Sequence, residues 1–469
     1  MCSKRIVGLA IAVMLVGLVG LVSVATAGDI PTRFGADLRL REEAFDHFPV
    51  PPQGQYDYFR VRPRVWGEAD LLPNVTFRAR AVDEFRIWDV PTTDKRQRRG
   101  TYEFPDEIVF DNLYLDLRDL LDKQLDLRVG RQEMIYGTGK VILEGTPEDG
   151  SRTIYFNAVK AVWKGIQDTT VDVFGIYDPA VDPIAVHTAH RDLTGYTGAN
   201  DDMTESGAGV YLKNKAIKAL PFEAYGIYKN ESEWDQAATK DPKSATGFKA
   251  PKLAWQTLDK ASGKINNDAL DLGTLGFRLM PKFTPDLSGN LEAAYQFGDR
   301  GGEKVTGWMT DAFATYAIPG CPWKSAVDAG VYYLSGDDPK TSKDEGWDPL
   351  WARYPQYSEL YVYLYPRGRW SNLMMPHAGV SMSPTAWLKT SAMVAYLNAP
   401  EKDGPGTGDE RGWLEVVKGE FTIAQGLLAK GERKDKLSGH VWLEVLQPGD
   451  YYTEDTTAYF ARWQLMYEF

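Results

Sequence analysis

The chain has little cysteine, little histidine and, beyond residue 27, no long apolar run. It holds 2 cysteines, and Cys2 lies in the N-terminal segment, so Cys321 is left alone and no disulfide framework can form. Without a long apolar run there is no candidate for a membrane-spanning helix, so any passage through a membrane must use β-strands. The formal net charge of -12 argues against a protein that binds nucleic acid.

Signatures of catalysis and metal binding are also scarce. Among the 5 histidines, only His187 and His190, with Asp182 nearby, have the spacing of a metal site, and solvated loop side chains are the simpler interpretation. The acidic pairs at 337–338 and 344–345 suggest Ca²⁺ only weakly. No phosphate-binding loop, nucleophile elbow or zinc-helix motif is present. We therefore expect no enzyme activity, no metal site and no cofactor.

The first 27 residues have the pattern of a secretory signal peptide. Two basic residues precede an apolar run at positions 6–24, and Ala25-Thr26-Ala27 offers a cleavage site between small residues. The alternative is a retained membrane helix, because the run is long enough to span a bilayer. We predict cleavage, which leaves residues 28–469 as one exported domain.

The end of the chain shows a pattern that recurs throughout the exported part. From 459 to 469 every second residue is apolar or aromatic, and Arg462, Gln464 and Glu468 lie between them. Successive side chains of a strand point to opposite faces, so this pattern predicts a strand with one apolar and one polar face. Its length suits a tilted strand that crosses a bilayer. About eighteen such segments occur by the same rules. They lie at 34–40, 59–71, 75–81, 113–118, 125–129, 159–164, 170–177, 209–213, 222–229, 272–280, 287–297, 307–317, 326–335, 373–382, 386–397, 412–428, 439–446 and 458–469.

The connections between these segments alternate between long and short. The stretch 42–57 is long, 71–74 is short, 89–107 is long and 119–123 is short. Membrane barrels have short periplasmic turns and longer outer loops, whereas a soluble β-sandwich, the alternative fold, has no reason to keep that rhythm. We therefore predict an all-β protein with a single transmembrane antiparallel β-barrel of about 18 strands. Such a barrel belongs in the outer membrane of a Gram-negative-type bacterium, surrounded by its lipid.

The polar face of these strands is rich in arginine. Arginines at alternate positions of a strand lie about 7 Å apart and repel one another unless an anion lies between them. Rings of basic side chains select anions in pores. The inward-facing set comprises Arg39, Arg41, Arg60, Arg62, Arg64, Arg78, Arg80, Arg118, Arg128, Arg278 and Arg462. The alternative is pairing with carboxylates of the wall, for which the candidates are Asp37, Glu68, Glu84, Asp116, Asp126, Glu292 and Glu444. We expect both uses, with a free cationic stripe at Arg60–Arg64.

Several of these segments resemble the alginate export family of outer-membrane barrels. The resemblance is carried by the early Arg-x-Arg strands, by Leu-Arg-Val-Gly-Arg-Gln at 127–132, and by Leu-Gln-Pro-Gly-Asp-Tyr-Tyr at 446–452 before the closing strand. It implies an eighteen-stranded monomer whose basic lumen passes an acidic polysaccharide outward by diffusion. By the same resemblance, the path would be lined by Arg60, Arg62, Arg128, Arg131 and Arg462.

Two residues depart from a regular strand pattern. Arg131 breaks the alternation set by Arg128, so a bulge or a strand end is expected beside it. Pro63 removes a donor from the hydrogen-bond ladder in the middle of a predicted strand, which suggests a second bulge.

The sequence therefore predicts an outer-membrane pore for an anionic polysaccharide, such as an alginate-like polyuronate, or for its fragments. A diffusion porin for small anions is one alternative, and a secreted all-β polysaccharide-binding protein or lyase is another. Expected partners are a sugar acid or its polymer, membrane lipid and a periplasmic export scaffold, with no nucleic acid. The predicted path residues are Arg39, Arg60, Arg62, Arg64, Arg78, Arg80, Arg118, Arg128, Arg131 and Arg462.

Overall fold

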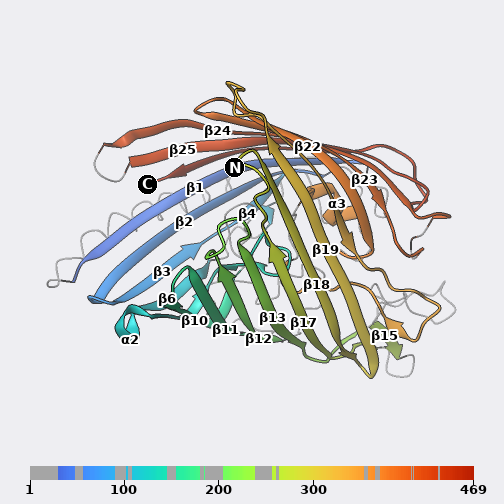
Figure 1. Cartoon of the computed structure of the whole chain (residues 1–469), viewed down its shortest axis with the longest axis horizontal. Helices are drawn as coiled ribbons and strands as arrows, with labels where there is room; N and C mark the ends of the chain where they lie inside the picture. Colours follow the sequence, from blue (N-terminus) through green and yellow to red (C-terminus); the bar gives the residue numbers. More distant parts are fainter. Residues whose placement is uncertain are drawn as a thin grey trace.

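The computed structural model shows a closed barrel of antiparallel strands (Figure 1). It describes residues 30–47, 56–89, 102–103, 108–144, 155–179, 184, 204–237, 256–259, 264–352, 357–364, 370–402, 404, 406–430 and 434–469. The predicted signal peptide lies outside these residues and stays a prediction.

Eighteen strands of the described chain form the barrel wall. They are β1 (Thr32–Asp46), β2 (Tyr56–Leu72), β3 (Val75–Val82), β6 (Val109–Asp119), β7 (Leu125–Gln132), β10 (Phe156–Ile166), β11 (Thr169–Asp178), β12 (Glu205–Asn214), β13 (Phe222–Glu231), β17 (Leu270–Leu279), β18 (Leu287–Arg300), β19 (Glu303–Ala317), β20 (Ala326–Leu334), β22 (Leu373–Thr385), β23 (Leu388–Asn398), β24 (Glu410–Lys430), β25 (Lys434–Gln447) and β26 (Ala458–Glu468). Each strand pairs with the next along the chain, and β26 pairs with β1 to close the sheet. The predicted fold is confirmed.

Shorter elements decorate the connections of the barrel. They are β4 (Phe85–Trp88), β5 (Tyr102–Glu103), α2 (Leu120–Lys123), β8 (Met134–Ile135), β9 (Leu143–Glu144), β14 (Trp234–Ala237), β15 (Gln256–Asp259), β16 (Lys264–Asn267), β21 (Lys343–Asp344) and α3 (Glu359–Leu364). Among the described residues, no helix is long and apolar enough to cross a bilayer.

Alternation along β1 separates an apolar outer face from a charged inner face. Leu38 is 49% exposed and Leu40 is 37% exposed, whereas Arg39 between them is 1% exposed and Arg41 is fully buried. In a water-soluble protein this distribution of side chains would be unfavourable, because apolar groups would be exposed to water and charged groups would be buried. It is the pattern of a strand with lipid outside and a polar interior, so the alternative of a soluble sandwich is wrong.

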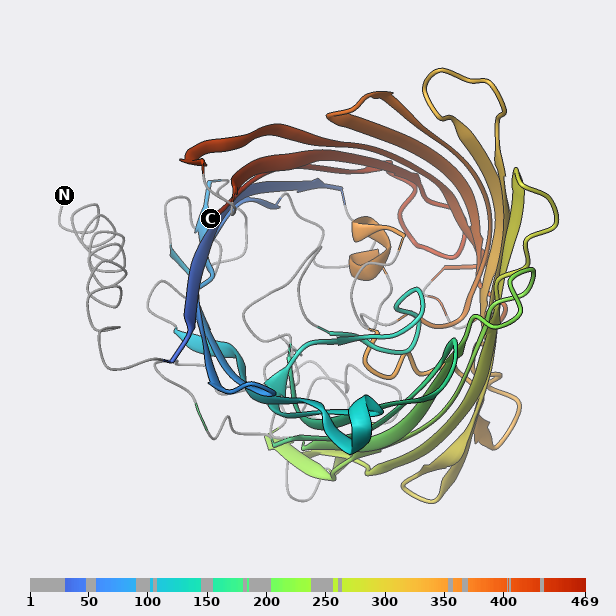
Figure 2. The same ribbon diagram turned by 60° about the vertical axis from the view of Figure 1, so that its left-hand side comes forward.

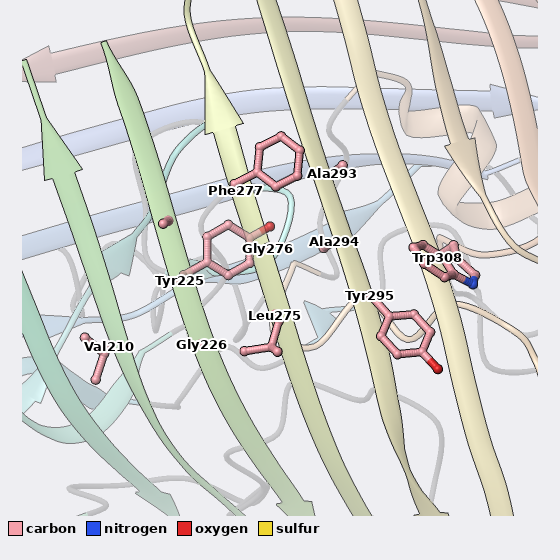
Figure 3. A pocket seen from close by; sticks show the side chains of 11 residues that line it. Val210, Tyr225, Gly226, Leu275, Gly276, Phe277, Ala293, Ala294, Tyr295 and Trp308 are labelled. Atoms are coloured by element: carbon pink, nitrogen blue, oxygen red, sulfur yellow. The ribbon is translucent and has the colours of Figure 1, made fainter. Parts of the chain in front are cut away.

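The apolar outer face continues around β12, β13 and β17 to β19. A shallow depression of about 490 Å³ lies there, where Leu275, Phe277, Tyr295 and Trp308 surround small residues (Figure 3). Leu275 and Trp308 are 57% and 58% exposed. The depression is therefore part of the lipid-facing surface and not an opening into the interior.

The connections keep the predicted alternation of lengths, with one exception. At the end where β1 begins and β26 ends, the turns from β2 to β3, β10 to β11 and β22 to β23 are tight. At the other end, β18 and β19 are joined by Gly301 and Gly302 alone, both at positive φ (60° and 91°), which a two-residue hairpin requires. The predicted long connection 42–57 is wrong in extent, because β1 continues to Asp46 and β2 begins at Tyr56.

Two loops from the long-loop end fold into the barrel and meet there (Figure 2). One joins β7 to β10 and contains the β8–β9 hairpin; the other joins β20 to β22 and contains α3. The Trp351 N–H donates to the carbonyl of Val141 at 3.2 Å, and the Leu143 N–H donates to the carbonyl of Trp351 at 3.3 Å. These backbone hydrogen bonds join the two loops inside the ring of strands. The joined loops narrow the interior of the barrel.

Pro63 breaks the neighbouring strand and leaves its own strand regular. The β1–β2 register runs through Leu38 and Pro63 without a shift, so the predicted bulge in β2 is wrong. On the other side, β3 ends at Val82 and β4 begins at Phe85. The carbonyl of Pro63 accepts a hydrogen bond from the Asp83 N–H there, at 3.2 Å. Because a strand residue directs its N–H and C=O to the same side, the missing donor faces this gap.

The expected irregularity beside Arg131 is present. Gly130 has a φ of 127°, a conformation that favours glycine, and β7 ends at Gln132 directly after Arg131. The predicted strand end at this point is confirmed.

Candidate functional site

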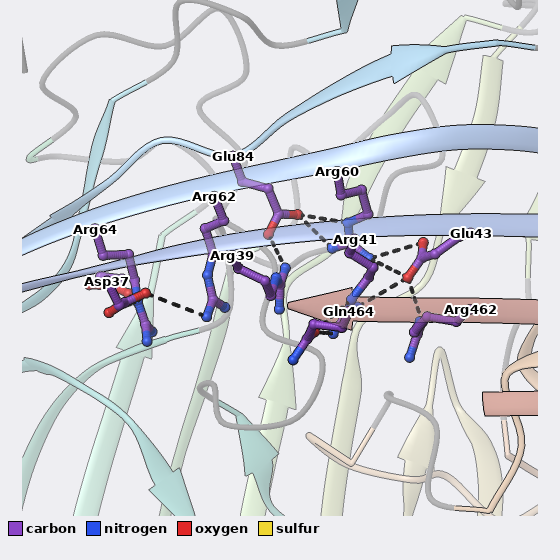
Figure 4. A network of polar contacts seen from close by, with 11 residues as sticks. Asp37, Arg39, Arg41, Glu43, Arg60, Arg62, Arg64, Glu84, Arg462 and Gln464 are labelled. Carbon is purple, nitrogen blue, oxygen red and sulfur yellow. Dashed lines mark hydrogen bonds and ion pairs between the residues drawn. The ribbon is translucent and has the colours of Figure 1, made fainter. Parts of the chain in front are cut away.

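Six arginines gather on the inner face of β1, β2 and β26 (Figure 4). This arginine cluster consists of Arg39, Arg41, Arg60, Arg62, Arg64 and Arg462. The register places Arg39 opposite Arg62 and Arg41 opposite Arg60. Side chains directly opposite each other in an antiparallel pair lie only about 4.5–5.5 Å apart at Cβ, so like charges there need compensation.

Glu84 supplies much of that compensation. It lies in the gap between β3 and β4 that faces Pro63. Its carboxylate accepts from Arg39 Nη2 at 2.5 Å and from Arg60 Nη2 at 2.5 Å. Because Glu84 lies in the gap between β3 and β4, its side chain can pair with Arg39 of β1 and with Arg60 of β2.

Three further carboxylates also pair with arginines of the cluster. Glu43 pairs with Arg462 at 2.5 Å and with Arg60 at 3.3 Å, and Arg41 donates to it at 3.1 Å. Glu359 of α3 also pairs with Arg462, which ties the folded-in loop to the wall.

Asp37 is the fourth carboxylate of the cluster. It pairs with Arg64 at 2.9 Å and lies 3.9 Å from Arg62. The predicted free stripe is therefore wrong, because carboxylates pair with Arg60, Arg62 and Arg64 alike. Asp111 also lies 4.0 Å from Arg64. Among the described residues, the six guanidinium groups of the cluster therefore share at least five carboxylates in one buried ionic network.

Replacing Glu84 tests the pairing directly. Glu84→Gln removes the charge shared by Arg39 and Arg60 and leaves two buried guanidinium groups undercompensated. Breaking one side of a buried pair costs about 3–5 kcal/mol, so the barrel should lose its heat-modifiable gel mobility at a clearly lower temperature.

The matched control for that experiment is Glu420→Gln. Glu420 pairs with Lys389 at 3.3 Å, but both side chains are more than half exposed. Exposed pairs contribute roughly 0–1 kcal/mol, so this variant should melt like the parent. Equal melting of the two variants would show that Glu84 does not stabilise the cluster.

The other predicted path arginines lie outside the cluster, and each is held by its own partner. Arg78 pairs with Glu68, Arg80 with Asp111 and Glu133, and Arg128 with Asp116, while Arg118 donates to Thr76 and Arg278 to Asn290. Arg131 is 1% exposed, donates to Asn157 at 3.0 Å and stacks on Tyr155 at 4.1 Å. These contacts brace the wall of β3, β6 and β7, and the contact of Arg278 joins β17 to β18.

The predicted wall carboxylates divide into two groups. Asp37, Glu68, Glu84 and Asp116 pair with arginines, as the bracing interpretation predicts. Asp126, Glu292 and Glu444 have other partners, namely Lys164, the Tyr225 hydroxyl, and Ser358 with the first backbone N–H groups of α3. Glu444 thereby fixes the folded-in helix to β25.

The sequence gives no sign of a second feature, the tip of the β8–β9 hairpin at residues 136–142. Tyr136 stacks on Tyr211 with ring centroids 4.4 Å apart, and its hydroxyl donates to Asp172 at 3.0 Å. The hydroxyl of Thr138 donates to Glu292 at 3.3 Å. Backbone turns at Gly137 and Gly139, with φ of 58° and 77°, allow this tight path. This hairpin tip therefore lies against β11, β12 and β18.

Lys140 anchors the hairpin tip in an aromatic cage. Its Nζ lies 4.1 Å from the ring centre of Tyr332, 3.8 Å from that of Tyr357, and 3.7 Å from Asp311. Burial lowers the pKa of Lys140 below that of an ordinary lysine, while Asp311 and Glu292 act in the opposite direction. Cation–π contacts of this kind are worth about 2 kcal/mol when desolvated.

The hairpin tip covers carboxylates of the barrel wall. Asp172 is 3% exposed, and Glu292 and Asp311 are fully buried. Tyr136, Thr138 and Lys140 contact these three side chains in turn. The hairpin tip thus screens these three carboxylates of the wall from the interior.

No metal site is found in the part of the chain that the structure describes. The loop acids at 337–338 and 344–345 bind backbone N–H groups of their own loop: Asp337 accepts from Glu345 at 3.2 Å, and Asp344 from Gly346 at 3.1 Å. His187, His190 and Asp182 lie outside the described residues.

A closed barrel with an apolar outer band, tight turns at one end, long loops at the other and a charged interior defines an outer-membrane β-barrel of the porin type. The chain belongs to the alginate export family, whose model matches residues 30–397. The predicted family and outer-membrane location are confirmed.

Solved structures show the same fold at low sequence identity. The chain is similar to OccK7 (OpdD) of Pseudomonas aeruginosa, with 11% identity, 93% of this chain and 98% of that chain covered, and a TM-score of 0.57. It is similar to OccK3 (OpdO) of the same organism, with 12% identity, 93% and 95% covered, and a TM-score of 0.53. OpdK of that organism, solved with vanillate, has 12% identity, 93% and 98% covered, and a TM-score of 0.55. No curated protein matches.

Proposed function

We propose that the protein is an outer-membrane pore through which an anionic polysaccharide, such as an alginate-like polyuronate, or its fragments diffuse. The observation that carries the proposal is the arginine cluster, in which six guanidinium groups and the carboxylates that they share gather on one inner wall. Membership of the alginate export family supports the same substrate class. A pore of this kind is a transport protein and performs no covalent chemistry.

The arginine cluster would act by replacing the counter-ions of the polymer. A uronate carboxylate that reaches the cluster competes with Asp37, Glu43 or Glu84 for guanidinium donors, which bind carboxylates in a bidentate way. Because each arginine already has a protein partner, the net gain from exchanging that partner for a uronate is small and no single sugar is held tightly. Weak binding at several neighbouring sites is what conduction requires.

The remaining path arginines would extend this surface toward the tight-turn end. Arg78, Arg118 and Arg128 lie along β3, β6 and β7, where Arg128 is paired but only partly buried. A monomeric state and a periplasmic scaffold partner stay predictions.

A pore for small anions is the second candidate, and the two folded-in loops favour it. They narrow the interior, and the similar barrel OpdK has been solved with vanillate, a small acid. The two candidates differ in one respect. In a polysaccharide pore, an extended polymer binds more tightly than a single sugar acid because it contacts several sites at once, whereas in a small-anion porin it does not.

Block of single-channel current separates the two candidates. Sodium alginate and sodium glucuronate are compared in planar bilayers at equal carboxylate concentration, with neutral dextran of matched size as the control. The proposal predicts reversible block by the polymer at a concentration at least ten times lower. Equal potency of the single sugar acid would instead establish a small-anion porin. Equal block by neutral dextran would show that the polymer obstructs the pore by its size alone, without binding to the arginines.

A further inference from the structure

A polar cavity opens on the inner wall near the tight-turn end of β23 to β26. It has a volume of about 400 Å³, within the roughly 300–1,000 Å³ of small-molecule sites. Its polar lining includes Lys389, Lys418, Ser438, His440, Trp442 and Gln464. On β25, Trp442 alternates with the exposed Val441 and Leu443, which places it on the inner face. We call this the turn-end cavity.

Two buried nitrogens in the turn-end cavity have no hydrogen-bond partner among the described residues. They are the indole Nε1 of Trp442 and the imidazole Nε2 of His440. Trp442 is 7% exposed. A buried polar group without a partner is unfavourable, so both atoms gain a hydrogen bond if a polar ligand enters.

The charge of the lining favours an anion. Lys418 Nζ lies 3.3 Å from the ring centre of Trp442, so its charge is held beside the unpartnered indole nitrogen. The lining also includes Lys389 and Lys436 but a single carboxylate, Glu420, which pairs with Lys389 at 3.3 Å. Lys436 pairs with Glu468 at 3.7 Å, at the rim.

The turn-end cavity adjoins the arginine cluster through one shared side chain. Gln464 lines the cavity, and its Oε1 accepts hydrogen bonds from Arg41 at 2.9 and 2.6 Å. On the neighbouring strand, Trp442 lies opposite Arg462, whose guanidinium carbon is 5.2 Å from the indole ring centre. A ligand that leaves the cavity along β26 thus meets the cluster directly.

We infer that the turn-end cavity is a binding site for one sugar acid at the periplasmic mouth of the pore. The carboxylate of the sugar would pair with Lys418, and its hydroxyl groups, which both donate and accept, would satisfy Trp442 Nε1 and His440 Nε2. The inference rests on the proposed function, because it makes the cavity the first place where the polymer binds before it reaches the arginine cluster. It adds a site that contains no arginine and that recognises a single residue of the polymer.

The indole N–H of Trp442 gives a local readout of binding. The whole protein is labelled with ¹⁵N-tryptophan in detergent micelles, and the Trp442 signal is assigned by its absence in Trp442→Phe. Sodium glucuronate should shift this signal in a saturable way, whereas glucose at the same concentration should leave it in place. A signal unmoved by glucuronate, or moved equally by glucose, overturns the inference.

Variants of Lys418 test its part in the site. Lys418→Gln and Lys418→Met, which keeps an apolar stem over the indole, should each raise the glucuronate concentration at half-shift at least ten-fold. Lys304→Gln, at an exposed position on β19 at the opposite end, should leave it unchanged. An unchanged half-shift in both Lys418 variants contradicts the assignment.

The failure of this inference can be told apart from failure of the proposed function. If Trp442 does not respond but alginate still blocks the channel more strongly than glucuronate, the pore function stands without a turn-end site. If Trp442 responds but polymer and single sugar acid block equally, the turn-end site stands in a small-anion porin.

Discussion

Removal of the hairpin tip should raise the single-channel conductance several-fold and lower the preference for anions. The change replaces residues 136–142 with two glycines, which can close the hairpin because Ile135 and Leu143 are already cross-strand partners. The larger conductance follows because the tip, joined to Trp351 of the second loop, occupies part of the interior. The change in selectivity follows because Asp172, Glu292 and Asp311 lose their cover and face the permeating ions.

Lys140→Met is the matched control for this deletion. It leaves the tip in its stack of aromatic rings but removes the positive charge next to Asp311. We expect a smaller loss of anion preference with an unchanged conductance. Unchanged conductance after the full deletion would mean that the hairpin tip does not limit the pore.

Reversal of charge at two positions of the arginine cluster should abolish its preference for anions. Arg60→Glu combined with Arg62→Glu replaces two guanidinium groups of the cluster with two carboxylates. The reversal potential in a salt gradient should move to the cation-selective side, and block by alginate should weaken at least ten-fold.

The control for this double variant changes the total charge equally, but at the surface. Lys304→Glu with Lys340→Glu alters two exposed lysines of the long-loop end, where solvent ions screen charge over about 8 Å. Heat-modifiable mobility on a gel confirms that both variants fold. Retained anion selectivity in the arginine variant would reject the cluster as the filter.

Much of the wall could be predicted from alternation alone. Each of the eighteen predicted segments overlaps one barrel strand, because a strand with lipid on one side and water on the other must repeat with a period of two. Strand ends were less predictable. β1 runs on to Asp46 through Glu42 and Glu43, since beyond the lipid the outer face can be polar and the alternation fades.

The arginines of the cluster could be predicted, and Asp37 and Glu84 were among the expected partners, but the individual pairs could not be predicted. Alternation places Arg39, Arg60 and Arg62 on the inner face, and it carries no information on which carboxylates reach them. Glu84 and Glu359 come from a break in the wall and from a folded-in helix, so their positions depend on tertiary structure.

The folded-in loops show the same limit of sequence patterns. The hairpin tip carries glycines and the aromatic Tyr136, which are common in surface loops as well. Its place inside the barrel depends on contacts with Tyr211, Tyr332 and Tyr357, far away in the chain. Pro63 correctly indicated an irregularity in the sheet. The irregularity lies in the neighbouring strand, between β3 and β4, where the N–H that proline lacks would have donated a hydrogen bond.

The reversal potential of the unmodified protein tests the central claim most directly. A single channel is recorded in a planar bilayer across a tenfold gradient of potassium chloride, before and after addition of alginate. The six arginines on one inner wall, with Asp172, Glu292 and Asp311 covered by the hairpin tip, lead us to expect a potential on the chloride-selective side and reversible block by the polymer. A cation-selective potential, or a current that alginate leaves unchanged, would contradict the account.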